Sequence, residues 1–142
     1  MRTNRFATGL ATGITLVGGL GIIAVGVRFL IAPEAGATGF GIPAPTGDAL
    51  AYLDVKGIRD IVSGLVVLIP LALGLRRPLG WTLLAAALTP ATDAAIVLTH
   101  GGSPAVAFGI HAATAAALLL AAGLLFRETR PSAAAAAPAP TR

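Results

Sequence analysis

Long apolar runs dominate the chain, and four of them are each close to the length of a membrane-spanning helix. They cover residues 7–31, 55–75, 79–99 and 104–126. A helix needs about 20 residues to cross about 30 Å of hydrocarbon. Backbone polar groups inside a membrane must be satisfied within the segment, which favours helices. The pattern therefore predicts an all-α fold with four transmembrane helices.

The connections between the runs indicate how these helices are arranged. Two of them, at 76–78 and 100–103, are short, and short connections imply antiparallel neighbours. The first connection, residues 32–54, is rich in proline and glycine and is expected to cover the helix ends. Pro70 and Pro90 fall inside the second and third helices and should kink them, because proline removes a backbone donor. The prediction is an antiparallel four-helix transmembrane bundle.

The two ends of the chain complete this picture. The domain is expected to cover residues 7–126, followed by a disordered, alanine- and proline-rich tail at 127–142. Gly9 and Gly13 form a GxxxG pair, a pattern that lets membrane helices approach closely. Glycine is also common in membrane helices generally, so a homo-oligomer is left open.

Composition supports a membrane location and excludes several classes of protein. The chain is 56% hydrophobic and only 11% charged, with a mean hydropathy of +0.86, whereas about a quarter of residues in soluble domains are charged. The expected partner is therefore the lipid bilayer. The net charge of +4 does not indicate nucleic acid, because the basic residues are scattered at the ends of apolar runs. The absence of cysteine excludes disulfides and thiolate sites, and the excess of arginine over lysine is typical of a bacterial protein.

The distribution of charge predicts the orientation. Six arginines and one acid belong to the segments at one side of the membrane, whereas Glu34, Asp48 and Asp54 belong to the other. Cytoplasmic segments carry an excess of Lys and Arg. We therefore expect a multi-pass protein of the cell (plasma) membrane with both termini in the cytoplasm.

Ionisable side chains within the predicted spans are the most informative feature. Each costs about 2.5–3.5 kcal/mol to insert, and such residues by default mark a functional site. Counting 1.5 Å per residue from the outer boundary puts them at depths of about 5–10 Å, in one layer of the outer half. The inner halves are almost purely apolar. The candidate polar pocket consists of Arg28, Lys56, Arg59, Asp60, Asp93 and His111.

Helical periodicity supports this convergence. At about 100° per residue, Lys56, Arg59 and Asp60 share an arc of about 100°. The opposite charges in this layer predict pairing of Arg59 with Asp93 or of Arg28 with Asp60. Such pairs could simply hold the helices together, although bonds of this kind contribute only about 0.6–2 kcal/mol in membranes. The alternative interpretation is a polar pocket in which carboxylates and a histidine exchange protons.

The chemistry of the pocket is less defined than its position. Asp60, Asp93, His100 and His111 are suitable metal-ligand types, but no single helix carries HxxH, HxxxH or ExxH spacing, so neither a metal nor a cofactor is predicted. Nucleotide and hydrolase motifs are absent from the sequence. No catalytic residue is assigned.

The segment Tyr52–Leu65, YLDVKGIRDIVSGL, resembles a family of small bacterial and fungal membrane proteins grouped as domain of unknown function 4267. Gly26–Leu30, Phe40–Pro43, Asp93 and His111 strengthen the resemblance, which extends over about residues 10–126. The resemblance implies four membrane-spanning helices. It implies no established activity, and no catalytic residue can be carried over from it.

Three functions agree with these observations. The first is binding of a small lipophilic ligand or a lipid headgroup in the outer-half pocket. The second is an enzyme performing acid–base isomerisation or cyclisation on a lipophilic substrate, with Asp60 or Asp93 as acid, His111 as partner and Arg59 as anion stabiliser. The third is a proton-coupled carrier or a purely structural membrane subunit, although the inner half offers no polar path.

Overall fold

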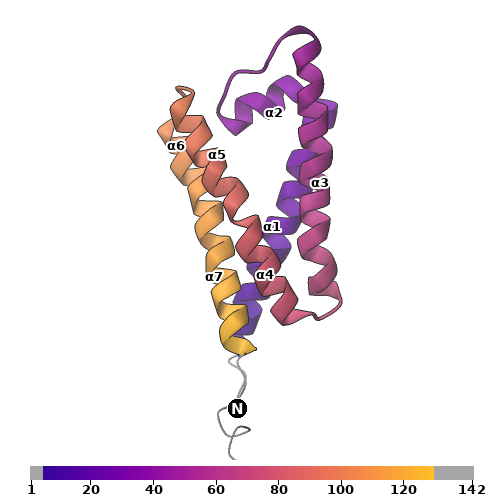
Figure 1. Ribbon diagram of the computed structural model, residues 1–142, viewed down its shortest axis with the longest axis vertical. Coiled ribbons are helices and arrows are strands. Elements are labelled where there is room, and N and C mark those ends of the chain that lie inside the picture. The colour runs from indigo at the N-terminus through magenta and orange to yellow at the C-terminus, as the bar shows by residue number, and fades with distance from the viewer. Residues whose placement is uncertain (1–4, 130–142) are drawn as a thin grey trace, which may run out of the picture.

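The computed structural model describes residues 5–129, and within that range every regular element is helical. The all-α class predicted from the sequence is confirmed. The predicted disordered tail lies outside the described residues from position 130 onward. The elements are α1 (Arg5–Ile31), α2 (Pro33–Phe40), the 3-10 turn η1 (Gly47–Leu50), α3 (Ala51–Ala72), α4 (Arg76–Ala86), α5 (Leu88–Thr99), α6 (Pro104–Val106), the π-helix η2 (Ala107–Ala112) and α7 (Ala113–Glu128) (Figure 1).

Three helical segments are long and apolar enough to cross a membrane. They are Arg5–Ile31, Arg76–Thr99 and Pro104–Glu128, and between 22% and 28% of each apolar stretch is buried inside the molecule. The outward-facing Leu, Ile and Val side chains therefore need a surrounding other than water. α3, with 22 residues, is nearly as long as these segments, but it carries four charged residues in its first ten positions.

Glycines bring α1 and α3 into close contact along their length. A Cβ added at Gly26 would lie 2.5 Å from the Gly57 carbonyl oxygen, and one added at Gly64 would lie 2.5 Å from that of Gly19. Gly26, late in α1, meets Gly57, early in α3, whereas Gly19 meets Gly64 farther along α3. The two helices are therefore antiparallel. Only a residue without a side chain permits this approach, which is the usual way membrane helices pack closely.

A second contact region joins α4, α7 and α1 at the end where α1 begins. Leu79, Leu83 and Leu125 are fully buried there, and Gly80 lies against the ring of Phe126. The Trp81 ring also packs on Phe126, with 4.8 Å between centroids. Figure 1 shows this end of the molecule opposite the end that carries α2. We call the two ends the Arg76 end and the α2 end.

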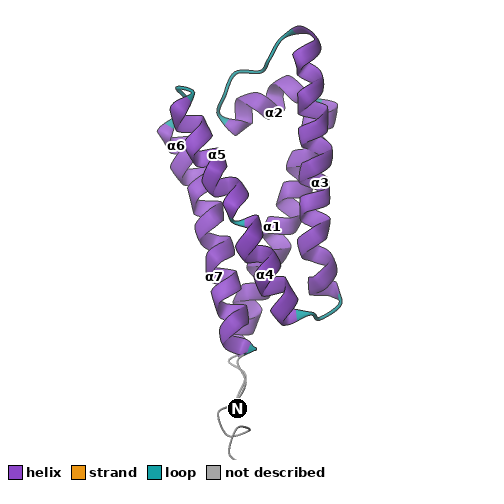
Figure 2. Ribbon diagram, in the orientation of Figure 1, coloured by secondary structure: helices purple, strands orange, loops and turns teal. Residues whose placement is uncertain are grey.

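The segment 76–99 is interrupted, and Pro90 explains where. A helix passing through this region would need the Pro90 nitrogen to donate to the carbonyl of Ala86, which proline cannot do. α4 accordingly ends at Ala86 and α5 begins at Leu88 (Figure 2). α3, in contrast, continues through Pro70 to Ala72.

The long first connection is more ordered than the sequence predicted. Residues 33–40 form α2, which has Pro33 in its first turn and ends at Gly41 with a left-handed φ of 105°. Gly36 packs on the Phe29 ring so closely that an added Cβ would lie 2.8 Å from it. α2 therefore lies against the end of α1 and reaches from the α1–α3 pair towards α5 (Figure 1).

Arg76 connects three helices at its end of the molecule. Its guanidinium donates to the Thr12 hydroxyl (3.0 Å) and the Thr8 carbonyl (3.4 Å) of α1, and to Glu128 of α7 (3.1 Å). Both charged side chains are about four-fifths buried. A partly buried charge with several partners contributes more than an exposed pair.

We expect Arg76→Ala to lower the free energy of unfolding by about 2 kcal/mol, because it leaves the Glu128 carboxylate without its partner. The matched control is Arg77→Ala, since Arg77 is exposed and the change should be within about 0.5 kcal/mol. Denaturant unfolding in detergent, followed by the fluorescence of Trp81, the single tryptophan, measures both. Equal losses in the two variants would contradict a specific role for Arg76.

Candidate functional site

An ion pair at the start of α3 forms the centre of the site. Lys56 Nζ lies 2.6 Å from Asp60 Oδ2, a pair spaced by one helical turn. The Asp60 side chain is 9% exposed and that of Lys56 27%. Gly57, between them, brings this face of α3 against Gly26 of α1. Close packing therefore buries the carboxylate, and its lysine partner keeps it from being an isolated buried charge.

Two aromatic rings from other elements cover the lysine. Lys56 Nζ lies 4.7 Å from the ring centroid of Phe29 in α1 and 4.9 Å from that of Phe40 in α2. An ammonium group this close to a ring face is attracted by the ring quadrupole. The ammonium group is thus held by a carboxylate and by two rings, and the position of α2 determines one of them.

His111 joins the site through its contacts with Phe40. Its Nε2–H donates to the Phe40 carbonyl (2.9 Å), and the two rings lie 4.6 Å apart. His111 is 7% exposed and lies in η2, a single π-helical stretch within the last long helix. Such π-helical insertions frequently occur at functional sites. With Nε2 as donor, the neutral ring offers Nδ1 as an acceptor.

Asp93 is the remaining acidic group. It lies half-buried on α5 and interacts electrostatically with Lys56, His111 and Asp60. Within residues 5–129 its carboxylate has neither a hydrogen bond nor an ion pair. Three separate parts of the chain therefore contribute ionisable groups to one place. We call Lys56, Asp60, Asp93 and His111, with Phe29 and Phe40, the Lys56 cluster.

The two arginines of the predicted pocket lie at its margin. Arg28 and Arg59 both have exposed side chains. The Arg28 guanidinium lies beside Gly39 of α2, 3.9 Å from where a Cβ would be. Neither expected pairing, Arg59 with Asp93 or Arg28 with Asp60, is formed. Asp60 pairs with Lys56 instead. Lys56 lies one turn away on the same helix, so the two side chains are neighbours whatever the position of the other helices.

Sequence reasoning missed the aromatic half of the cluster. Phe29 and Phe40 were predicted neither to contact Lys56 nor to connect it with His111. Phe40 begins the segment Phe40–Pro43, which is part of the family resemblance. The sequence therefore did contain a signal that Phe40 is important. His100 lies outside the cluster, exposed at the end of α5, with Nδ1 2.9 Å from the Ile96 carbonyl.

The cluster offers acid–base groups but no set of metal ligands. In the part of the chain that the structure describes, no three His, Asp or Glu side chains lie close enough to hold a metal ion. The chemically available atoms are the Asp93 carboxylate and the His111 Nδ1 position. Together with the Lys56 ammonium group they can bind a polar group that both donates and accepts hydrogen bonds.

Comparison with protein families finds a match. The model of the domain of unknown function DUF4267 covers residues 19–125, well over half of the chain. The chain belongs to the DUF4267 family. This agrees with the resemblance that the segment Tyr52–Leu65 suggested. No curated protein and no solved structure matches the chain.

The DUF4267 match covers every member of the Lys56 cluster, from Phe29 to His111. It excludes Arg5 and the first turns of α1. The family description names no activity, so the chemistry of this DUF4267 protein has to be inferred from the cluster itself.

Proposed function

We propose that this protein is a multi-pass plasma-membrane protein that binds the polar head of a small lipophilic molecule at the Lys56 cluster. In this proposal α1, α3, α4–α5 and α6–α7 form an antiparallel four-helix transmembrane bundle. The cluster then lies in its outer half, and the apolar part of the ligand lies among the helices or in the surrounding lipid.

The packing of α3 supports its assignment as the fourth span. α3 follows α1, which is long and apolar enough to cross a membrane, through close glycine contacts at both Gly26 and Gly19. From position 61 to 72 its only polar side chain is Ser63, whose hydroxyl donates to the Arg59 carbonyl. The charges of α3 are thus confined to its first turns, at the depth where a polar layer can contact the membrane surface.

Charge supports the orientation. Arg5, Arg76, Arg77 and Arg127 lie at the ends of helices at the Arg76 end, whereas Glu34, Asp48 and Asp54 belong to α2, η1 and the start of α3 at the opposite end. The excess of arginine at one end favours a cytoplasmic location for that end and for both termini.

The unpaired, half-buried carboxylate of Asp93 is the observation that carries the binding proposal. A polar group in such a place costs free energy unless something binds to it. Lys56 and His111 act on the same place electrostatically. A ligand with a hydroxyl or amine donor satisfies Asp93, and a neighbouring oxygen of the ligand can accept from Lys56.

The test is to extract the protein with its native lipids into nanodiscs and to identify co-purifying lipophilic molecules by mass spectrometry. Asp93→Asn and His111→Ala should retain about tenfold less of the ligand than wild type, because each removes a hydrogen-bonding group. Asp54→Asn and His100→Ala are matched controls, since both residues are exposed and lie outside the cluster. The controls should retain the ligand.

Two outcomes would overturn the binding proposal. One is that wild type carries no specific molecule while Asp93→Asn and His111→Ala only melt earlier, which would mean that the cluster merely holds helices together. The other is equal retention in all five proteins. Conversion of the retained molecule on incubation, lost in Asp93→Asn, would instead make the protein an acid–base enzyme.

A further inference from the structure

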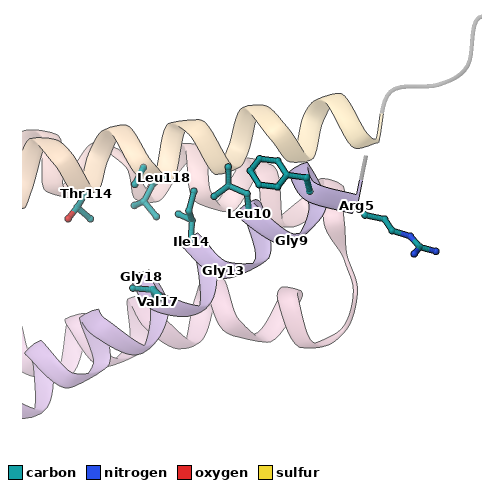
Figure 3. A pocket seen from close by; sticks show the side chains of 11 residues that line it. Arg5, Gly9, Leu10, Gly13, Ile14, Val17, Gly18, Thr114 and Leu118 are labelled. Carbon is teal, nitrogen blue, oxygen red and sulfur yellow. The ribbon is translucent and has the colours of Figure 1, made fainter. Parts of the chain in front are cut away.

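An apolar groove runs between α1 and α7 in the half of the molecule towards the Arg76 end, away from the Lys56 cluster. Its volume is about 780 Å³, and it is lined by Gly9, Gly13 and Gly18 of α1 together with Leu10, Val17 and Leu118. Figure 3 shows Arg5 at one end of this groove and Thr114 of α7 near the other. It is thus a separate feature from the proposed ligand site.

The glycines keep the groove open. Cβ atoms added at Gly9 and Gly13 would meet no atom within 4 Å, in contrast to Gly26 and Gly64, which contact the neighbouring helix directly. The GxxxG pair of α1 therefore does not serve packing among residues 5–129. It leaves a channel along the surface of α1 that something outside the described chain can fill.

The ends of the groove differ in charge. Among the described residues, Arg5 is the one charged residue that lines the groove, and it forms no ion pair with any of them. Thr114, near the other end, already donates its hydroxyl to the Ile110 carbonyl (2.7 Å). The groove thus offers a cation at its mouth and no free donor farther in. A molecule with an anionic head and an apolar tail matches this arrangement.

We propose that the groove binds one acyl chain of an anionic phospholipid whose phosphate pairs with Arg5. From Arg5 to Gly18 the groove follows α1 for about 20 Å at 1.5 Å per residue, and one leaflet supplies about half of the ~30 Å hydrocarbon core. The length therefore suits a single chain within one leaflet. Arg127, near the same end, adds to the attraction for an anionic headgroup.

A second copy of the chain is the rival occupant. A two-fold dimer through Gly9 and Gly13 would present the same face from both copies. If the two α1 helices were parallel, as in GxxxG pairs, the two Arg5 side chains would approach each other. Like charges disfavour that contact. The charge at the mouth therefore favours a phospholipid.

Native mass spectrometry from detergent, with equal amounts of phosphatidylglycerol and phosphatidylcholine added, tests the proposal. Wild type should retain one phosphatidylglycerol molecule in preference to phosphatidylcholine. Gly13→Leu, or Gly9→Leu as a second variant, should lose it because the leucine fills the groove. Arg5→Gln should reduce the preference for the anionic lipid about fivefold.

Two matched controls accompany these variants. Gly21→Leu places the same side chain on another open position of α1 outside the groove, and Arg77→Gln removes an exposed charge at the same end. Both should retain the lipid as wild type does. Equal retention of the two lipids, or retention unaffected by Gly13→Leu and Gly9→Leu, would overturn the proposal. So would a dimer that Gly13→Leu converts to monomer with no lipid bound to either form.

Discussion

Replacing Lys56 with methionine is expected to lower the free energy of unfolding by about 3 kcal/mol at neutral pH, because removing one partner of a buried ion pair leaves an uncompensated charge. The uncompensated group is Asp60, which is only 6% exposed. Methionine retains the apolar stem of lysine, so the loss reports the charge more than the packing.

A double variant separates these two causes. Lys56→Met combined with Asp60→Asn should recover most of the loss, since no charge is then left unpaired. Arg59→Met is the matched control, because Arg59 lies on the same helix with an exposed side chain, and the change there should be within about 0.5 kcal/mol. Denaturant unfolding followed by Trp81 fluorescence measures all four proteins. If the double variant were no more stable than Lys56→Met alone, the ion pair would not be the source of the effect.

Replacing Gly26 with alanine is expected to cost about 3 kcal/mol, at the upper end of overpacking effects, because the obstructing atoms belong to the backbone. The new Cβ would lie 2.5 Å from the Gly57 carbonyl oxygen and 2.9 Å from the Ile61 nitrogen. No side-chain rotation relieves such contacts, so α1 and α3 must separate.

Gly21→Ala provides the comparison for this prediction. An added Cβ at Gly21 meets nothing within 4 Å, and alanine is the better helix former. The control should therefore unfold at the same denaturant concentration as wild type or at a slightly higher one. Similar destabilisation by the two substitutions would show that helix propensity, and not the contact between α1 and α3, determines the result.

The sequence was sufficient to predict the long helices, because an apolar run of about 20 residues can be recognised from its length and residue types alone. It did not predict α2. That helix has only eight residues, which include Pro33, Gly36 and Gly39, and its position depends on contacts such as Gly36 with Phe29. The π-helical stretch around His111 was also missed, because hydropathy carries no information on hydrogen-bond register.

For the candidate site, the sequence provided two kinds of information: the depth of each residue along its helix and the helix face on which the residue lies. Lys56, Asp60 and His111 lie within electrostatic range of Asp93. Arg59 is at the same depth but faces outward. At about 100° per residue it is about 60° from Lys56, on the side away from Asp60. An arc of 100° on α3 was thus too wide for all its residues to face the interior. The function of the Lys56 cluster stays a prediction.

Side chains distant in the sequence meet around Lys56, and the lysine itself allows a direct test of this arrangement. Lys56 is the only lysine in the chain. Protein labelled with 13C and 15N in lysine therefore gives one set of lysine side-chain NMR signals, with no assignment needed. The measurement is the chemical shift of the Lys56 Cε protons in nanodiscs, for wild type and for Phe40→Leu.

In wild type, the signals should be moved upfield by the ring currents of Phe29 and Phe40, whose centroids lie 4.7 and 4.9 Å from Nζ. Phe40→Leu should move the signals part of the way back towards the values of a free lysine, and Phe6→Leu, at the far end of α1, should leave them in place. Signals at the positions of an exposed lysine, unaffected by Phe40→Leu, would contradict the cluster and every functional proposal that depends on it.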